Sequence, residues 1–243
     1  MSQKFAVFDI DGTLFRWQLF HELVFELKDQ GLLDESANQS LEQAIQDWRG
    51  LKASWSDYES QVISAIQKHI MHIKPAELEE AARVVVERSG HKVYAYTANL
   101  AKELKNKGYF LLAISGSQQE IAELFAKKHG FDACIGMVHA RNGDGEFTGE
   151  YERFTYGNKA AIAREFAANN NLTYDESYAI GDSAGDIDML ETVTYPIAFN
   201  PSSELYDAAS THNWPVVIER KNIVYRLEKD DNNGYAVAET RVF

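Results

Sequence analysis

The sequence predicts an α/β protein, in which a parallel β-sheet is covered by helices on both faces and is interrupted near its start by an inserted block of helices. The first of three observations is a short apolar, β-rich segment over residues 4–8. The second is the long stretch 17–89, in which apolar residues recur at helical spacing. The third is the alternation of strand-like and helix-like segments after Gly90, which is typical of parallel strands joined by right-handed crossovers.

The inserted block reads as several consecutive helices. Five apolar residues near its start share one face of a helix: Leu19, Phe20, Leu23, Val24 and Leu27. Ser56 and Glu59 have the spacing of a capping box, which predicts a helix that ends near Met71. Pro75 suits the first turn of a further helix over residues 76–88.

After Gly90 the expected elements alternate. Helices are predicted over residues 97–107, 118–129 and 158–168. Strands are predicted over residues 109–114, 137–140, 146–151, 178–180, 196–199 and 216–218. Asn142-Gly143 is a hairpin turn signal, and a second hairpin is predicted from strands over 223–227 and 235–242 around a polar turn at 230–234.

These elements predict a three-layer Rossmann-like core with a parallel sheet over residues 1–15 and 90–243. An all-helical cap is inserted over residues 16–89, and a β-hairpin closes the chain. The length of 243 residues suffices for one domain with an insert of this size.

Composition narrows the class of protein. Lys plus Arg number 24 and Asp plus Glu number 37, so the net charge is 24 − 37 = −13, which argues against nucleic-acid partners and anionic membrane surfaces. No apolar run approaches the roughly 18–20 residues of a membrane span, and the first apolar run is too short for a secretory signal. Cys134 is the only cysteine, so no intramolecular disulfide forms. The sequence therefore predicts a cytoplasmic protein without membrane contact; it predicts no oligomeric state.

Polar motifs follow the predicted strands. The segment DIDGT (residues 9–13) follows the first strand, Ser115 follows the second, Lys159 begins a helix, and GDSAGD (residues 181–186) follows a later strand. Because ligands of open parallel sheets bind at the carboxyl ends of the strands, all four features are expected to converge on one crevice. Taken singly, each has a structural alternative as a turn or a helix cap; their occurrence together and in this order favours a functional site.

The chemistry that needs this set is phosphoryl transfer through an aspartyl intermediate. A carboxylate such as Asp9 can attack phosphorus, but the repulsion between two anions requires a hard cation between them. Mg²⁺ is bound by a few carboxylates, here Asp9 and Asp182, with Asp186 placed to orient metal-bound water. Asp11 can protonate the leaving alkoxide and then activate water.

The remaining motif residues would bind the phosphate. Lys159 would neutralise the transferring oxygens, and Ser115 with the neighbouring backbone N–H groups, including that of Gly116, would complete the phosphate cradle. Gly12 would allow the backbone to approach the phosphate closely.

Together these motifs resemble those of the haloacid dehalogenase superfamily, and within it the phosphoserine phosphatase-like group, whose helical cap follows the first motif. The segment NGDGEFTG (residues 142–149), followed by Lys159, is similar to that group as well. The resemblance implies Asp9 as nucleophile, Asp11 as general acid and base, and Ser115 and Lys159 as phosphate ligands. It implies Mg²⁺ held by Asp9, the Asp11 carbonyl and Asp182, with Asp186 in support.

The sequence departs from the phosphoserine enzymes at three places. Gly12 stands where they usually have Ser, Gln18 stands at the spacing of their cap Glu, and Val62 stands near their cap Arg. The substrate is therefore expected to be a small phosphorylated metabolite, with phosphoserine itself disfavoured. Arg16 and Gln18, at the entrance of the cap, are the candidate substrate-binding residues.

Other readings stay open. Aromatic residues of the cap either pack its helices or face the substrate, with packing favoured: Trp17, His21, Trp48, Trp55 and Tyr58. Carbon–halogen hydrolysis needs no second Asp and no metal, so Asp11 and Asp182 argue against it. A phosphoacceptor signalling domain needs no cap, and a non-catalytic phosphate-binding protein would retain the motifs without turnover.

Overall fold

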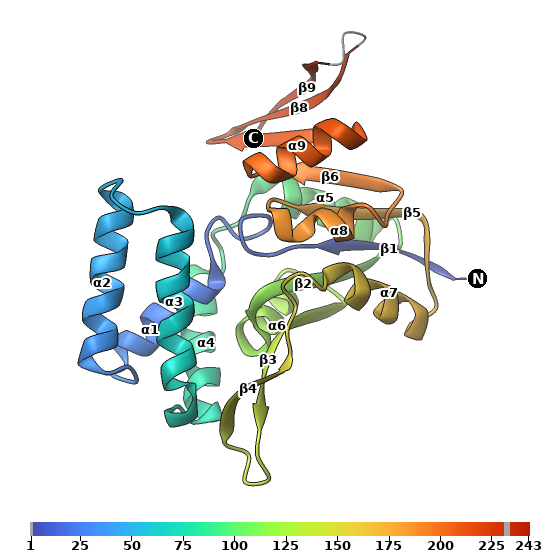
Figure 1. The fold of residues 1–243 in the computed structure, drawn as a ribbon. Helices are drawn as coiled ribbons and strands as arrows, with labels where there is room; N and C mark the ends of the chain where they lie inside the picture. Colours follow the sequence, from blue (N-terminus) through green and yellow to red (C-terminus); the bar gives the residue numbers. More distant parts are fainter. Residues whose placement is uncertain (1, 231–233) are drawn as a thin grey trace.

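The computed structural model describes residues 2–230 and 234–243, and within them nine strands form one sheet (Figure 1). Its strand order is β4-β3-β2-β1-β5-β6-β7-β8-β9. The strands are β1 (Gln3–Phe8), β2 (Phe110–Gln118), β3 (Ala133–Arg141), β4 (Phe147–Arg153), β5 (Leu172–Gly181), β6 (Tyr195–Phe199), β7 (Val216–Arg220), β8 (Ile223–Lys229) and β9 (Tyr235–Val242). The strands from β3 to β7 across the sheet are parallel, whereas β4, β8 and β9 pair antiparallel at its two ends.

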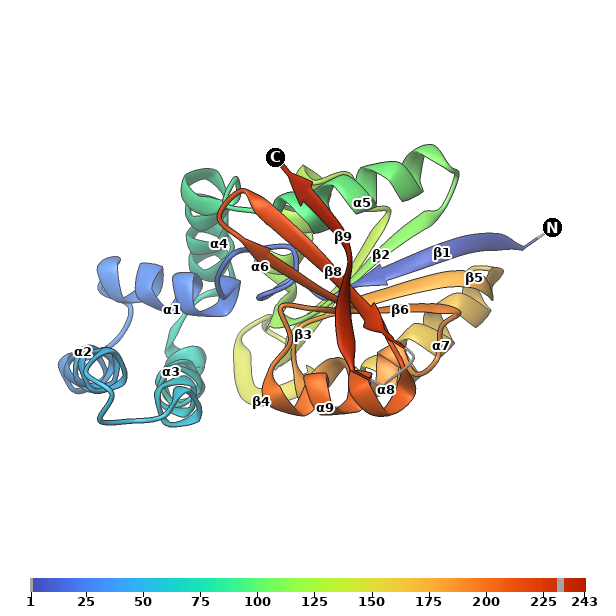
Figure 2. The ribbon, with the colours of Figure 1, turned by 90° about the horizontal axis from the view of Figure 1, so that it is seen from above.

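The central strand β1 is buried on both faces. Phe5 and Val7 belong to one apolar core, and Ala6 and Phe8 belong to another, as the two-residue period of a strand requires. Two helices cover one face of the sheet and three cover the other (Figure 2): α5 (Ala95–Asn106) and α6 (Gln119–Lys128) against α7 (Lys159–Asn169), α8 (Ile187–Leu190) and α9 (Ser203–His212). The predicted three-layer α/β core is thus confirmed.

The insert between β1 and α5 is helical, as predicted. It comprises α1 (Leu19–Asp29), α2 (Glu35–Arg49), α3 (Trp55–His69), a short 3₁₀ helix η1 (Ile70–His72) and α4 (Pro75–Ser89). These helices stand beside the sheet in Figure 1, and apolar side chains of α1 and α4 join the core that contains Phe8. The division of the chain into a core (1–15 and 90–243) and a cap (16–89) stays a prediction.

Helix α3 begins two residues earlier than the sequence predicts. Ser54 is the N-cap: its Oγ accepts a hydrogen bond from the Asp57 N–H at 3.1 Å, and Asp57 Oδ2 accepts one from the Ser54 N–H at 2.9 Å. The predicted capping box of Ser56 and Glu59 is wrong. The overlapping Ser54–Asp57 pair has the same spacing and caps the helix N-terminus two residues earlier. The side chain of Glu59 therefore has no capping role.

Other differences lie at element ends. Strand β2 continues beyond the predicted residue 114 to Gln118, and α9 and the short helices η2 (Ala184–Asp186) and α8 lie outside the predicted elements. The β3–β4 hairpin is confirmed, but its loop spans residues 142–146 and the positive φ of +83° falls on Gly145. The C-terminal hairpin is confirmed as β8 and β9, while residues 231–233 of its predicted turn lie outside the described residues.

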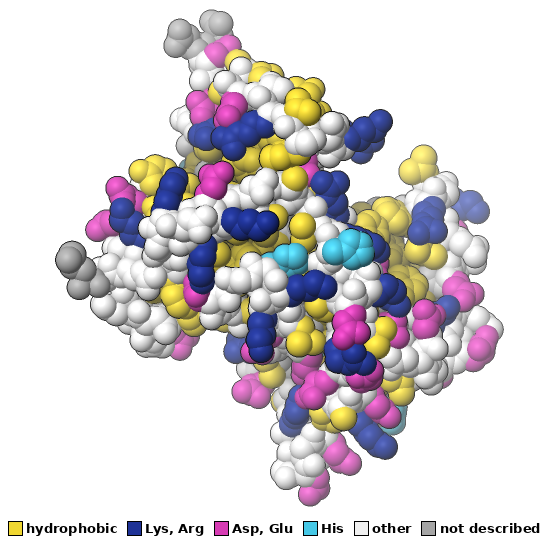
Figure 3. All heavy atoms as spheres, turned by 180° about the vertical axis from the view of Figure 1, so that it is seen from behind, with side chains coloured by type: hydrophobic (Ala, Val, Ile, Leu, Met, Phe, Trp, Pro, Cys, Tyr) yellow, Lys and Arg dark blue, Asp and Glu magenta, His cyan; other side chains and the backbone are white. Residues whose placement is uncertain are grey.

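The surface carries both signs of charge. On the face shown in Figure 3, acidic and basic side chains are interspersed. In the described part of the chain, no helix has the length and apolar character needed to cross a membrane.

Glu219 of β7 links the sheet to both connections of the insert. Its side chain is 1% exposed and forms an ion pair with Arg16, on the outgoing connection. Its carboxylate oxygens accept hydrogen bonds from the N–H groups of Ala95 (3.1 Å) and Tyr96 (2.9 Å), at the start of α5 on the returning connection. Arg16 Nε in turn donates to the Val93 carbonyl at 2.7 Å. One buried carboxylate thus holds the two connections together, at a helix N-terminus that favours negative charge.

Replacement of this carboxylate tests its contribution to stability. We expect Glu219→Gln to lower the free energy of unfolding by about 1–3 kcal/mol, because the amide loses the charge-assisted bonds to Arg16 and to the α5 N-terminus. Urea denaturation followed by circular dichroism measures this change. The exposed Glu150→Gln variant on β4 is the control, and equal stability of the two variants would contradict the role of Glu219.

Candidate active site

The register of the sheet brings the predicted motifs together. Phe8 at the end of β1 lies opposite Ala113 of β2 and Ile180 of β5. The next residue, Asp9, is fixed by a hydrogen bond from its N–H to the Ile180 carbonyl at 2.9 Å. The DIDGT loop, the Ser115 segment and the GDSAGD loop therefore leave three adjacent parallel strands at the same edge of the sheet, as the sequence predicts.

Lys159 is held between two carboxylates. Its Nζ lies 2.6 Å from Asp9 Oδ1 and 2.6 Å from Asp186 Oδ1, and all three side chains are buried. Burial alone would lower the pKa of Lys159, but the charges of Asp186 and Asp9 outweigh it and raise that pKa above its usual value. Lys159 is therefore a permanent cation at the first residue of α7.

Negative charge exceeds positive charge in this cluster. Asp9, Asp182 and Asp186 each have a carboxylate oxygen within 4.8 Å of those of the other two, with Lys159 as the cation among them. Burial is the main cause that raises the pKa of Asp9 to about 7, and the charges of Asp186 and Asp11 raise it further, while Lys159 offsets part of the shift. The cluster has the oxygen donors and the excess charge that a hard divalent cation requires.

Two of these carboxylates have oxygens that differ in their hydrogen bonding. Asp9 Oδ2 is buried and receives no hydrogen bond from any described residue. Asp186 Oδ2, in contrast, accepts bonds from the Asp182 N–H (3.2 Å), the Ser183 N–H (3.0 Å) and the Ser183 hydroxyl (3.0 Å). The unpaired Asp9 oxygen fits a metal or a phosphorus atom, whereas Asp186 is already committed to its own loop and to Lys159.

Asp182 also has a raised pKa. Burial is the largest cause, followed by the charges of Asp9 and Asp186. Its Oδ1 accepts a hydrogen bond from the Thr13 hydroxyl at 3.1 Å, which ties the DIDGT loop to the GDSAGD loop.

Asp11 points to different partners from those of Asp9. Its Oδ2 accepts hydrogen bonds from the hydroxyls of Ser115 (2.6 Å) and Ser117 (2.9 Å), and its Oδ1 accepts one from the Leu19 N–H (2.5 Å) at the start of α1. Burial raises the pKa of Asp11, and these hydrogen bonds offset part of the rise. The Asp11 carboxyl therefore lies between β2 and the first helix of the insert.

Two features of the structure require a glycine at position 12: the local backbone conformation and the close approach of the Asp182 side chain. The φ of Gly12 is +83°, and a Cβ at this position would lie 2.1 Å from Asp182 Oδ2. The sequence predicts that Gly12 allows the backbone to approach a phosphate. The contact with Asp182 is a second reason for a glycine at this position. Gly116 differs, because a Cβ there would have no atom within 4 Å.

The two predicted substrate-binding residues lie outside the buried cluster. The Arg16 guanidinium is bound to Glu219 and to the Val93 carbonyl and lies over the Tyr94 ring, 5.1 Å from its centroid. Gln18 is the N-cap residue of α1 and makes no capping hydrogen bond with its side chain. The substrate-binding role of both residues stays a prediction, and Arg16 already donates hydrogen bonds to Glu219 and to the Val93 carbonyl.

Ser117 and Thr13 are contacts of the site that sequence reasoning missed. Ser117 follows Ser115 at the two-residue period of a strand, so continuation of β2 through residue 118 would have placed both hydroxyls on the same face. Thr13 was part of the recognised DIDGT segment, but its partner Asp182 is 169 positions away in sequence.

The geometry agrees with a comparison of the sequence against known families. A sequence model described as haloacid dehalogenase-like hydrolase matches residues 6–191, which extend from β1 to the end of α8 and include every motif residue of the site. The chain belongs to the haloacid dehalogenase-like hydrolase family. Among its matches, phosphoserine phosphatases recur, so within the family the chain is phosphoserine phosphatase-like.

Three relatives show the range of similarity. A protein of Streptomyces azureus named inhibition of morphological differentiation protein is 35% identical over 126 residues, which are 51% of this chain and 46% of the relative. A phosphoserine phosphatase of Methanocaldococcus jannaschii is 24% identical, over 91% of this chain and 95% of the relative. The crystal structure of a protein of unknown function from Bordetella pertussis Tohama I has a TM-score of 0.73 at 20% identity, over 90% of this chain and 99% of that one.

Coverage differs among these relatives. The chain spans about half the length of the first curated relatives it matches. The similarity to the solved structure establishes the shared fold.

A side chain at position 12 tests the packing of the two loops. We expect Gly12→Ala to destabilise the fold by about 1–3 kcal/mol from the backbone conformation alone and to displace Asp182. Thermal and urea unfolding measure the loss. Gly143→Ala in the β3–β4 loop is the matched control, since a Cβ there has no neighbour within 4 Å and its φ is not positive. Equal stability of the two variants would show that the loops are not packed as described.

Proposed function

We propose that the chain is a Mg²⁺-dependent phosphomonoester hydrolase that acts on a small phosphorylated metabolite through an aspartyl-phosphate intermediate. The buried Asp9 carboxylate carries the proposal. One of its oxygens is neutralised by Lys159, and the other is unpaired at the carboxyl edge of a parallel sheet. Membership of the haloacid dehalogenase-like hydrolase family and the similarity to phosphatases support the same chemistry.

The cation would be held by Asp9, Asp182 and the Asp11 backbone carbonyl, with Asp186 in support. When bound, Mg²⁺ supplies the positive charge that allows an anionic carboxylate to approach an anionic phosphate. Asp186 would position both Lys159 and the loop that carries Asp182, as the four hydrogen bonds that its carboxylate accepts indicate.

In the first step, Asp9 Oδ2 attacks phosphorus and the bond from phosphorus to the leaving oxygen breaks. Lys159, together with Ser115 and the backbone N–H of Gly116, would bind the phosphate oxygens as negative charge redistributes. Asp11 would donate its proton to the leaving alkoxide, and its raised pKa keeps that proton available.

In the second step, Asp11 takes a proton from water while the water oxygen attacks phosphorus and the bond to Asp9 breaks. The net reaction converts the ester and water into an alcohol and inorganic phosphate, and the enzyme returns to its starting state. The hydrogen bond from the Leu19 N–H to Asp11 places the acid–base group in contact with the insert.

The helical insert would act as a cap, excluding bulk water and selecting the leaving alcohol. A cap above a buried carboxylate leaves room for a small metabolite rather than for a protein. We propose a cytoplasmic location, since a single cysteine cannot form the intramolecular disulfide that is typical of secreted proteins.

The mechanism is tested by phosphate release from a panel of small phosphomonoesters, with Mg²⁺ and with EDTA. We expect Mg²⁺-dependent release that falls at least about 10³-fold in Asp9→Asn, since removal of a nucleophile leaves only binding and electrostatic contributions. Asp144→Asn, in an exposed loop, is the control. A stable phosphoprotein without turnover would instead favour a phosphoacceptor role, and folded protein with no reaction would favour phosphate binding only.

The cation site is tested without turnover, through the pH dependence of stability. Burial raises the pKa of Asp9 to about 7 and raises that of Asp182 well above the usual value of an aspartate, so from about pH 4 to 7 the folded state binds more protons than the unfolded state. Without metal, these groups therefore lower stability as pH rises through that window. Mg²⁺ replaces protons, so we expect it to raise the melting temperature more at pH 8 than at pH 5. A shift that is equal at both pH values, or unchanged in Asp182→Asn, would contradict the site.

A further inference from the structure

Glu59 occupies an unusual place on helix α3. The buried residues of α3 are Tyr58, Val62, Ala65 and Ile66. Glu59 precedes Val62 by three positions and Ile66 by seven, so it lies on the same inward stripe of the helix. Its side chain is half-buried. A carboxylate on such a stripe normally has a hydrogen-bond or ion-pair partner, since its desolvation is otherwise uncompensated.

Glu59 has no such partner among residues 2–230 and 234–243. The neighbouring carboxylate on the helix, Asp57, is used in the N-terminal cap, and Glu59 is not. Burial raises the pKa of Glu59, and the negative charge of Asp11 raises it further. The charges of Glu59 and Asp11 therefore interact, and no ion pair of the described residues compensates Glu59.

A series of aromatic ring contacts extends from the residue that follows Arg16 to helix α3, which carries Glu59. We call them the aromatic cluster, which consists of Trp17, His21, Trp48, Trp55 and Tyr58. The cluster starts beside the site, because the Gly12 N–H donates to the Trp17 carbonyl at 3.0 Å. The Trp17 ring lies 5.5 Å from the Trp55 ring, and Trp55 precedes Glu59 by one helical turn.

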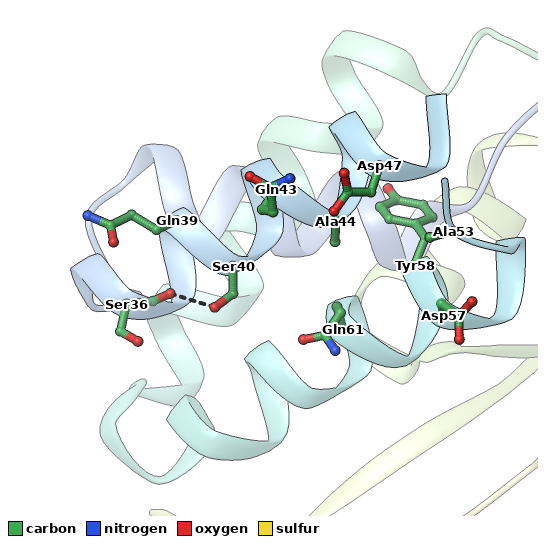
Figure 4. Close-up of a pocket in the computed structure, with 10 residues that line it drawn as sticks. All are labelled: Ser36, Gln39, Ser40, Gln43, Ala44, Asp47, Ala53, Asp57, Tyr58 and Gln61. Atoms are coloured by element: carbon green, nitrogen blue, oxygen red, sulfur yellow. Dashed lines mark hydrogen bonds between the residues drawn. The ribbon is translucent and has the colours of Figure 1, made fainter. Parts of the chain in front are cut away.

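The rings of the cluster differ in exposure. Tyr58 and His21 are 1% exposed and form its interior, and Figure 4 shows the Tyr58 ring between α2 and α3. The three tryptophans are only partly buried. They pack against the core, as the packing interpretation predicts, and each keeps part of its surface exposed to solvent.

Basic side chains near this region are committed elsewhere or lie outside it. Lys159 is bound between Asp9 and Asp186, and Arg16 is bound to Glu219. Arg49, at the end of α2, is exposed, and its positive charge offsets part of the rise that burial causes in the pKa of Tyr58. A carboxylate on the leaving group would therefore meet Asp11 and Glu59 and would be repelled.

We propose that Glu59 and the partly exposed tryptophans of the aromatic cluster bind a positively charged group on the leaving alcohol, so that the substrates are phosphomonoesters of amino or quaternary-ammonium alcohols. This inference rests on the proposed phosphatase function and specifies its substrate class. An ammonium ion satisfies the unpaired carboxylate of Glu59, and aromatic faces attract cations through their quadrupole. Phosphoserine carries the same ammonium group, but its additional carboxylate makes it a poorer substrate than phosphoethanolamine.

Two matched pairs of esters isolate the charge. Phosphocholine differs from 3,3-dimethylbutyl phosphate in a nitrogen that replaces a carbon, and phosphoethanolamine differs from propyl phosphate in an ammonium that replaces a methyl group. We expect the wild type to favour the cationic member of at least one pair by about tenfold in kcat/KM. Glu59→Gln should remove most of this preference, measured within the variant as the ratio of kcat/KM for the two members of each pair. Glu165→Gln, an exposed position on α7, should behave as wild type.

Equal rates on both members of each pair, or a preference that persists in Glu59→Gln, would overturn the inference while the phosphatase function stands. If no ester is hydrolysed, the proposed function fails, and binding decides the inference separately. Choline and ethanolamine titrated into the full chain should change tryptophan fluorescence and release heat, at least about tenfold more weakly in Glu59→Gln. No binding, or equal binding by both proteins, would overturn it. Circular dichroism confirms that the variant is folded.

Discussion

The interaction on which the rest of the site depends is the buried contact of Lys159 with Asp9 and Asp186. Carboxylates at this edge of the sheet repel each other, and burial increases the cost of their charge. The lysine stabilises two of them, and Asp186 in turn fixes the loop that carries Asp182. In the proposed mechanism, the remaining excess of negative charge would be balanced by a divalent cation, and the unpaired oxygen of Asp9 would be the nucleophile.

The insert is connected to this cluster through backbone and carboxylate contacts rather than through a flexible tether. The Leu19 N–H at the start of α1 binds Asp11, the Trp17 carbonyl binds Gly12, and Glu219 holds both connecting segments against β7. Movement of the insert would therefore change the position of the Asp11 carboxyl. If the insert closes over a substrate as proposed, its position is linked to that of the proposed acid–base group.

Specificity and catalysis are separated in the structure. In the proposed mechanism, the groups at the ends of β1, β2 and β5 bind only the phosphate and a metal, so they suit any phosphomonoester. Glu59 and the aromatic cluster come from the insert and are proposed to bind the alcohol. Gln18 and Val62 stand where phosphoserine enzymes have charged cap residues, and the half-buried Glu59 supplies a single negative charge in their place. Such a site favours cations over zwitterions.

The sequence by itself determined the layered α/β fold, the helical insert and the identity of the motif residues, because hydrophobic periodicity and strand ends are local properties of the chain. Only the tertiary structure decided the partners. Lys159 and Asp9 are 150 positions apart, and Arg16 and Glu219 are 203 apart, so their pairing depends on strand order. Spacing alone also does not decide which of two overlapping capping boxes begins α3. The structure uses Ser54 and Asp57, which leaves Glu59 on the inward face of the helix.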